Sequence, residues 1–515
     1  MGKMIIFGST SVTAKTGKPS SNINLASTVK LDGYQRANAT TQTLIQFREI
    51  TMHHAHACSR TSITSFVGRS VLVTGWLLLM FQTGCSGGEP MVQLPDKVQA
   101  TPVNQTATLA PVTPSDWPQI RGTGGAGVAA GETLDPWGKD GPEKVWSAKV
   151  GAGFSSPIVF GNHLFIVHRT SGTNEPMTAD LMFADTGKIV WRQHLRCAYG
   201  NGEMDGDPGP KATPAYDEGK IFVYDPAGTM FCLDATTGDT VWQKDLAKKY
   251  GTNRGYFGVG TSPIVCGKNV VINAGGRDAA VVALDKQTGQ EAWAAFDDRA
   301  SYSSPVQLTV DGRQAVLVIT RLHVVGIDAD SGSLAFKMRF GKTGPTAIGA
   351  MPVLAGDNIF VNSAYNVGCK TLALSGGEKS FGEDNYEPRT LWSDQEVFAS
   401  QYSTPVLHNG MLYGTSGRED FGNGSFRCFD PLTGNLKWQQ SNIAVGHTLL
   451  VGNRLVFMDH KANLRLIEAS PDGYKQLSEF KLYDSASKTI PALAGGRLYT
   501  RSDGANATLD CWKLN

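Results

Sequence analysis

Five arginines occupy one kind of position in this 515-residue chain: each follows a hydrophobic segment, at the corner that leads to the next segment. A guanidinium group presents a planar fork of donors that matches carboxylates and phosphates, and it also stacks on sugars and aromatic rings. Two tyrosines lie in long loops expected on the same side. These residues predict a face that binds an acidic ligand, either an acidic glycan or an acidic loop of an envelope protein. The residues of this face are Arg169, Arg277, Arg321, Arg418, Arg501, Tyr256 and Tyr302.

A structural interpretation of the same arginines stays open. In that interpretation they pair with neighbouring loop acids, such as Asp298 or Asp420, and only seal the face. The whole chain is nearly neutral, with 47 Lys and Arg against 46 Asp and Glu, so its net charge does not favour nucleic acid or an anionic membrane surface as a partner.

Other patterns that could support chemistry are weak. The stretch "DADSG" at Asp328 is similar to part of a calcium loop, but it coincides with a repeated turn, which favours a structural role. The eight cysteines include no CxxC and no adjacent pair. No His/Ser/Asp spacing suggests a catalytic triad, and no glycine-rich loop precedes a helix. We therefore predict no catalytic residue, no metal and no bound cofactor.

The elements that position the arginines repeat along the chain. The stretch "CLDATTGDTVW", which ends at Trp242, has copies that end at Trp191, Trp293 and Trp438, and a weaker one that ends at Phe336. Asp and Thr satisfy the turn's own backbone groups, glycine takes a positive φ, and the aromatic residue four positions later points from the outgoing strand toward the next sheet.

The period of these turns reveals a missing copy. Gly187, Gly238, Gly289, Gly332 and Gly434 are separated by 51, 51, 43 and 102 residues, so a degenerate unit lies before the last glycine. The stretch "LALSGGEKSF", with Trp392 in its outgoing strand, fits this unit. The five tryptophans are expected to pack between neighbouring sheets rather than to stack on a cofactor.

A second signal runs in phase with the turns. A proline, preceded in most copies by Ser or Thr and by Met or Ile in two, opens a hydrophobic strand at Pro157, Pro214, Pro263, Pro305, Pro352, Pro405 and Pro491, and a unit without proline surrounds Thr448. Proline suits the start of a strand because no ladder N–H is needed there. Eight units of four antiparallel strands predict an all-β, eight-bladed propeller.

The ends of the repeated region predict how the ring closes. An orphan outgoing strand, Glu143–Val150, precedes the first unit, and the chain stops after a third strand at "LDCWKLN". Pairing the two completes the last blade and removes an exposed edge. The short Thr-Gly turns then lie on one side of the ring, and the long, varied loops and the arginine corners lie on the other.

The repeat resembles the tryptophan-docking repeat of the PQQ-like propeller superfamily, over Trp117–Asn515, and the opening "DWPQIRGTGGAGV" is also similar to members of that superfamily. This superfamily includes quinoprotein alcohol dehydrogenases and BamB-like outer-membrane assembly lipoproteins. The enzymes hold PQQ between a tryptophan and a disulfide of adjacent cysteines, beside a calcium ion. This chain has no adjacent cysteines and offers no matching calcium ligands. The resemblance therefore favours a non-catalytic BamB-like binding protein, with a PQQ- and calcium-dependent oxidoreductase acting on an alcohol or polyol as the alternative.

The N-terminal region differs in composition. Residues 1–51 look like a spurious or disordered extension, and residues 52–85 resemble a signal peptide with a short apolar core and a lipobox-like end, Thr83-Gly84-Cys85. A lipid on Cys85 would anchor the protein at the periplasmic face of the outer membrane or at the cell surface; an ordinary secretory signal is the alternative. Residues 86–116 are predicted to form a flexible tether, and residues 117–515 the propeller.

Overall fold

The computed structural model describes residues 106–131, 133–169, 176–197, 209–252, 257–504 and 506–514. All of them belong to one compact unit, Gly88–Asn515. The predicted extension, the signal peptide with Cys85, and the tether as far as residue 105 lie outside the described residues. Among the residues described, no helix has the length and apolar character needed to cross a membrane.

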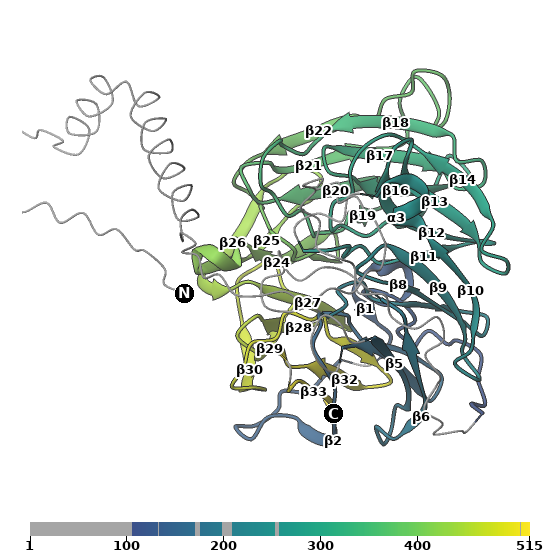
Figure 1. Ribbon diagram of the computed structural model, residues 1–515. Coiled ribbons are helices and arrows are strands. Elements are labelled where there is room, and N and C mark those ends of the chain that lie inside the picture. The colour runs from purple at the N-terminus through teal and green to yellow at the C-terminus, as the bar shows by residue number, and fades with distance from the viewer. Residues whose placement is uncertain are drawn as a thin grey trace, which may run out of the picture. The chain divides into compact units, whose positions relative to one another are not determined.

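The described strands form eight sheets arranged as an eight-bladed propeller, which confirms the predicted fold (Figure 1). In blades 1 to 7, the four antiparallel strands follow one another in sequence order, and blade 8 is completed by β2 from the start of the described region. Blade 1 comprises β3 (Ile158–Phe160), β4 (His163–His168), β5 (Met177–Phe183) and β6 (Ile189–Leu195). Blade 2 comprises β7 (Ala215–Asp217), β8 (Lys220–Tyr224), β9 (Thr229–Asp234) and β10 (Thr240–Asp245). Blade 3 comprises β11 (Ile264–Cys266), β12 (Asn269–Gly276), β13 (Ala279–Asp285) and β14 (Glu291–Ala295). Blade 4 comprises β15 (Val306–Val310), β16 (Arg313–Ile319), β17 (His323–Asp328) and β18 (Leu334–Arg339).

The second half of the ring repeats this order. Blade 5 comprises β19 (Val353–Ala355), β20 (Asn358–Ser363), β21 (Gly368–Ala373) and β22 (Arg389–Asp394). Blade 6 comprises β23 (Val406–His408), β24 (Met411–Ser416), β25 (Asn423–Phe429) and β26 (Leu436–Ala444). Blade 7 comprises β27 (Gly446–Val451), β28 (Arg454–Asp459), β29 (Asn463–Glu468) and β30 (Gln476–Lys481). Blade 8 comprises β31 (Ala492–Ala494), β32 (Arg497–Arg501), β33 (Thr508–Lys513) and β2 (Glu143–Lys149). Helical structure is confined to α3 (Leu246–Tyr250) and the single turns η1 (Thr123–Gly125) and η2 (Glu419–Phe421) in the described parts of the chain.

The ring closes as the sequence predicts. Strand β2 pairs antiparallel with β33, from Glu143 opposite Lys513 to Lys149 opposite Thr508. The indole of Trp146 in β2 then reaches blade 1, where its Nε1 donates to the carbonyl of Ala184 at 3.0 Å. The first and last parts of the chain are thus joined in one blade and across one blade interface.

The repeat tryptophans lie between neighbouring blades. Trp293 of blade 3, for example, donates its Nε1–H to the carbonyl of Ala329 in blade 4 at 3.0 Å. Gly332 in that turn has a φ of 75°, and a Cβ there would lie only 2.5 Å from Cγ of Trp293. The glycine therefore provides both a left-handed turn and a flat surface for the indole ring. The same contact from an indole to the next turn occurs at Trp191, Trp242, Trp392 and Trp438.

In the first four blades, the residue before the strand-opening proline links neighbouring blades. The N–H of Ser156 donates to the hydroxyl of Thr213, the N–H of Thr213 to Ser262, and the N–H of Ser262 to Ser304, over 2.8–3.4 Å. These residues are at most 2% exposed. In these blades the Ser/Thr-Pro signal therefore reflects buried hydrogen bonds that join the inner strand of one blade to that of the next.

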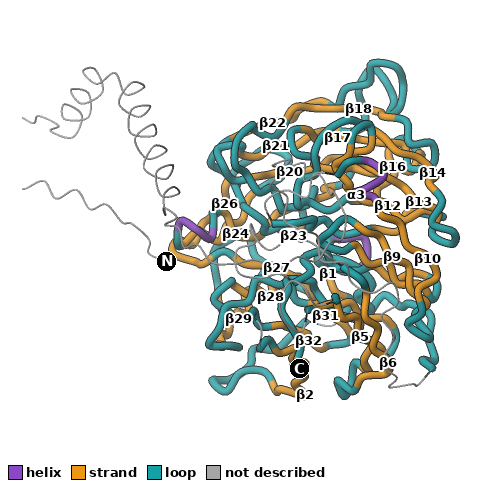
Figure 2. The backbone as a smooth tube through the Cα atoms, in the orientation of Figure 1, coloured by secondary structure: helices purple, strands orange, loops and turns teal. Residues whose placement is uncertain are grey.

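A segment before β2 crosses the side of the ring that carries the Thr-Gly turns, which we call the turn face. Trp117 pairs with Val159 of blade 1, and Ile120 packs in the core shared by blades 4 and 5. Arg121, 1% exposed, donates to the carbonyl of Pro405 at 3.1 Å. Strand β1 (Val128–Ala129) then adds a parallel fifth strand to β27 (Figure 2). The centre of the ring is therefore crossed by the chain itself on this face.

Part of the predicted tether belongs to this segment. Ala107 is buried, and its N–H donates to the carbonyl of Thr236 in blade 2 at 3.0 Å. Asp116 accepts a hydrogen bond from the N–H of Gly161 at 3.0 Å. Within the segment predicted as a tether, residues 106–116 therefore contact the propeller at Ala107 and Asp116. The Pro/Thr-rich composition of this part of the segment thus accompanies an irregular backbone that contacts the surface of the propeller.

Candidate functional site

The side opposite the turn face, which we call the long-loop face, carries the β-strand corners and the loops between blades. The structure places two of the predicted arginines beneath this face rather than on it. Arg169 and Arg501 are each 0% exposed. Arg501 donates to the carbonyls of Gly151 and Ser155, and Arg169 donates to Sγ of Cys197 at 3.3 Å. Both therefore support loops, and neither contributes to an exposed binding surface.

The other three arginines differ in their contacts. Arg321 donates to the carbonyls of Lys342 and Gly344, and so holds the loop after β18. Arg277 is exposed at the corner between β12 and β13. Arg418 lies between two aromatic rings, with its Cζ 4.1 Å from the centroid of Tyr365 and 4.3 Å from that of Phe421.

Only one of the two expected acid partners pairs with an arginine. Asp420 binds the guanidinium of Arg418, as the structural interpretation expects. Asp298 instead accepts hydrogen bonds from the N–H of Leu322 and from Thr320, and its Oδ2 lies 2.9 Å from Nδ1 of His323. The arginine corners thus do not form one uniform ring of exposed cations.

The two predicted tyrosines have separate outcomes. Tyr256 lies outside the described residues. Tyr302 is half-buried on the long-loop face, where its hydroxyl accepts a hydrogen bond from the N–H of Phe257 at 3.1 Å and its own N–H donates to Ile348. Its ring is therefore held in a defined orientation beside the start of the inner strand of blade 4.

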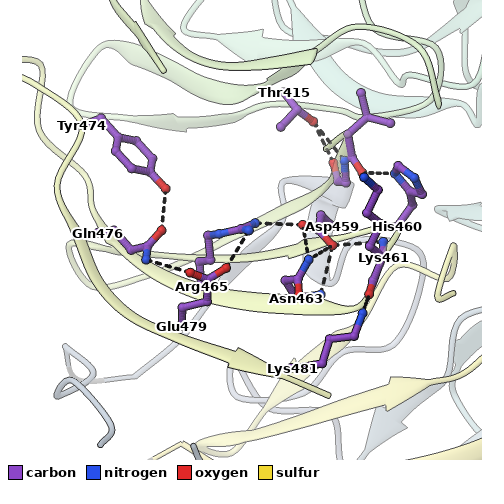
Figure 3. A network of polar contacts seen from close by, with 12 residues as sticks. Thr415, Asp459, His460, Lys461, Asn463, Arg465, Tyr474, Gln476, Glu479 and Lys481 are labelled. Carbon is purple, nitrogen blue, oxygen red and sulfur yellow. Dashed lines mark hydrogen bonds and ion pairs between the residues drawn. The ribbon is translucent and has the colours of Figure 1, made fainter. Parts of the chain in front are cut away.

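The corner of blade 7 carries an acid instead of an arginine (Figure 3). Asp459, 1% exposed, accepts hydrogen bonds from the backbone and side chain of Asn463 and pairs with Arg465 at 2.9 Å. Arg465 also pairs with Glu479 of β30 at 2.7 Å. His460 donates its backbone N–H to the carbonyl of Val445 at 2.9 Å. This corner is satisfied internally and fixes the loop that precedes β27.

Asp328 and the described cysteines occupy structural rather than reactive positions. Asp328 Oδ1 accepts the N–H groups of Asp330 and Ser331, so this carboxylate stabilises its own turn. The six described cysteines are buried and unbridged, and burial raises the pKa of Cys232 and Cys369 to about 12 and of Cys266 to about 11. Such thiols are not nucleophilic near neutral pH. Within the described ranges, no three His, Cys, Asp or Glu side chains are grouped to hold a metal ion.

The loop that enters blade 1 is held by a buried charged cluster. Asp180 binds Arg192 through both carboxylate oxygens, at 2.6 and 2.7 Å, and its Oδ2 lies 3.0 Å from Nε2 of His168. The other ring nitrogen of His168 accepts the N–H of Gly151 at 3.0 Å. Burial lowers the pKa of His168, so the imidazole is neutral and donates to Asp180. The cluster joins β4, β5 and β6 to the backbone of Gly151 and so supports this loop.

The sequence of the chain matches a known protein family. The sequence pattern of the family described as "Outer membrane protein assembly factor BamB" matches residues 177–440, about half of the chain. The chain belongs to this family. The BamB of Yersinia pestis is 22% identical over 277 residues, and that of Escherichia coli K12 is 24% identical over 273 residues. These matches span 52% and 50% of this chain, and 65% and 63% of the length of the relatives.

Solved structures confirm the fold alone. BamB from Moraxella catarrhalis superposes with a TM-score of 0.52 at 16% identity, over 72% of this chain and 98% of that one. A quinohemoprotein alcohol dehydrogenase from Comamonas testosteroni gives 0.55 at 14% identity, over 78% of this chain and 80% of the enzyme. A computationally designed protein, Ika8, gives 0.50. An assembly factor, an enzyme and a designed protein share this ring, so the fold alone does not indicate a function.

Proposed function

We propose that this protein is a non-catalytic scaffold of the bacterial cell envelope, exported and lipid-anchored, which binds an envelope protein through its long-loop face. The family match carries the proposal, because the relatives are named as factors of outer-membrane protein assembly. The distribution of contacts supports it: the turn face is crossed by the chain's own N-terminal segment, whereas exposed Arg277 and the stacked Arg418 lie on the opposite face.

The residues present do not favour the alternative, a PQQ-dependent oxidoreductase. The resemblance to those enzymes requires a disulfide between adjacent cysteines, and no two cysteines are adjacent in this sequence. The tryptophans that could stack on a quinone lie between blades and donate to turn carbonyls. Purified protein supplied with PQQ and Ca²⁺ should show no stoichiometric quinone absorbance and no dye reduction; turnover of an alcohol would overturn the proposal.

The anchor is tested at Cys85. We expect cells given a fatty-acid analogue to label the wild-type protein and to retain it in the membrane fraction, because the sulfur of Cys85 follows a short apolar core and Thr-Gly. The Cys85→Ser variant should be exported but unlabelled. Equal labelling and membrane retention of the two proteins would contradict lipidation at this residue.

The binding face is tested by the paired substitution Arg277→Ala and Arg418→Ala. The wild-type protein, cross-linked in envelopes of its own bacterium, should capture components of outer-membrane protein assembly, and loss of the gene should lower the amount of folded outer-membrane proteins. The paired variant should fold normally and capture less, with a steep dependence on salt, since exposed charges are screened over about 10 Å at 0.1 M salt. A matched pair, Lys475→Ala and Lys513→Ala, removes two exposed cations elsewhere and should leave capture unchanged.

Two results would contradict this assignment. If the paired arginine variant melts earlier and captures as well as wild type, the arginines only seal the face. If the wild type captures no assembly component and its loss leaves outer-membrane proteins unchanged, the scaffold function itself is wrong.

A further inference from the structure

In the seven blades with a strand-opening proline, the loop that leads into the first strand carries one residue three positions before that proline. In five blades this residue is aromatic or lysine. We call these residues the mouth ring: Phe154, Lys211, Tyr302, Tyr402 and Lys488. All five are half-buried on the long-loop face, where the innermost strands begin.

Side-chain contacts connect one part of the mouth ring directly. Nζ of Lys211 lies 5.3 Å from the centroid of the Phe154 ring, and Nζ of Lys488 lies 5.7 Å from the same centroid. An ammonium group within about 6 Å of an aromatic face is attracted by the ring's quadrupole. Phe154 therefore holds two lysines, which come from the blades on either side of it.

Two of the blades carry a glycine at this position, Gly260 and Gly349. A Cβ on Gly260 would lie 2.8 Å from Cδ1 of Tyr302 and 3.5 Å from Cβ of Lys211. A Cβ on Gly349 would lie 2.9 Å from Cβ of Tyr402. Each tyrosine thus leans over a blade that has no side chain at this position, so the aromatic and cationic groups continue from blade 2 to blade 6.

The final link is a carboxylate of the chain itself. Glu419, in the corner of blade 6, accepts a hydrogen bond from the hydroxyl of Tyr402 at 3.2 Å, and its other oxygen lies 2.9 Å from Nζ of Lys488. Both partners of this ion pair stay partly exposed, Lys488 at 34% and Glu419 at 24%. The ring therefore already binds one carboxylate between a phenol and an ammonium group.

The backbone beneath the mouth ring is held by hydrogen bonds between blades. The N–H groups of Phe154 and Ser155 both donate to the carbonyl of Pro210, at 2.8 and 2.9 Å. The N–H of Gly349 donates to the carbonyl of Gln401 at 2.9 Å. Arg501 holds the Phe154 loop from below through the carbonyl of Ser155 at 3.4 Å. A site whose loops are fixed before binding loses little conformational entropy when a ligand binds.

We infer that the mouth ring is a binding site for an acidic peptide segment of the partner protein, in which carboxylates flank an apolar side chain. The apolar side chain would pack on Phe154, and the carboxylates would pair with Lys211 and with Lys488, which Glu419 binds in the structure. This inference rests on the proposed function, since it names the part of the partner that the long-loop face would bind. Half-buried lysines around a phenyl ring fit a peptide better than a sulfated glycan, which needs exposed cations along a chain of charges.

The test uses fluorescently labelled, capped peptides and the purified full chain. A peptide of repeating Glu-Leu should bind, and repeating Lys-Leu and Ser-Leu peptides should not. Lys211→Gln and Phe154→Ala should each weaken Glu-Leu binding about tenfold or more, as is usual for anchors at the centre of an interface. Lys475→Gln serves as the matched control, because Lys475 forms an exposed ion pair with Glu468 away from the mouth ring. Phe154→Leu keeps an apolar side chain and should retain most of the binding if Phe154→Ala proves unstable.

The possible results separate this inference from the proposed function. No binding of the Glu-Leu peptide, or binding that Lys211→Gln and Phe154→Ala leave intact, overturns the mouth ring as the site. Heparin that binds more tightly and displaces the peptide overturns the peptide in favour of an acidic glycan. If either occurs while cross-linking still captures an assembly component, the scaffold function stands and only its contact site is wrong.

Discussion

Removal of β2 should prevent the propeller from folding as a stable ring. A protein that begins at Gly151 lacks the strand that pairs with β33, and it also lacks Trp146, whose indole binds the turn of blade 1. The unpaired edge of β33 and the uncovered flank of blade 1 would both be exposed, and exposed edges promote aggregation. We expect an insoluble product, or a melting temperature lower by about 10 °C or more than that of a protein that begins at residue 106.

A protein of intermediate length distinguishes the contribution of β2 from that of the segment that crosses the turn face. A protein that begins at Glu143 keeps β2 but loses Trp117, Arg121 and β1. It should be soluble and melt between the other two, because the ring is closed while the buried contacts of Arg121 with Pro405 and Thr448 are lost. Thermal melts and size-exclusion profiles of the three proteins measure this order. Coincident melts for the proteins that begin at Glu143 and Gly151 would show that β2 does not close the ring.

The repeat and the closing strand could be predicted because they follow from local rules. The Thr-Gly turn sets the spacing to each tryptophan, and the period of 51 residues locates even the degenerate unit with Trp392. These signals depend on neighbouring residues along the chain, and a period of two along the strand fixes which side chains face the next blade.

The features that the sequence did not predict depend on contacts between distant segments. The segment from Trp117 to β1 has no period, and each of its contacts lies on a different blade. Arg169 and Arg501 share a corner position with Arg277, yet only the latter is exposed. The residues of a corner do not show whether its guanidinium binds loop carbonyls or reaches solvent, because this depends on the neighbouring loop that covers the corner.

The mouth ring was hidden for a similar reason. The loops that carry Phe154, Tyr302 and Lys488 differ in length and composition, and they align only when counted back from the strand-opening proline. The glycines that make room for the tyrosines, Gly260 and Gly349, resemble ordinary loop glycines in the sequence. A count from the proline could have found the level of the ring, but not which side chains meet there.

Loss of one repeat tryptophan should also strongly destabilise the ring. Trp293 is 6% exposed and fills the interface between blades 3 and 4. Trp293→Ala removes this buried side chain and leaves the carbonyl of Ala329 without its donor, so we expect the free energy of unfolding to fall by about 3–5 kcal/mol. Trp293→Phe keeps an aromatic ring and loses the hydrogen bond, so it should cost about 1–2 kcal/mol. Denaturant unfolding of the two variants measures both values.

A double substitution tests why the turn glycine is needed. Gly332→Ala alone places a Cβ 2.5 Å from Cγ of Trp293 and also strains a residue with a φ of 75°, so it should destabilise the protein through both effects. In the Trp293→Ala background the ring is gone, and only the cost of the positive φ, about 1 kcal/mol, should remain. The two substitutions should therefore be less destabilising together than the sum of their separate effects. Strict additivity would mean that Gly332 serves the turn alone, and that the fixed spacing from Gly to Trp in each repeat reflects hairpin geometry rather than docking between blades.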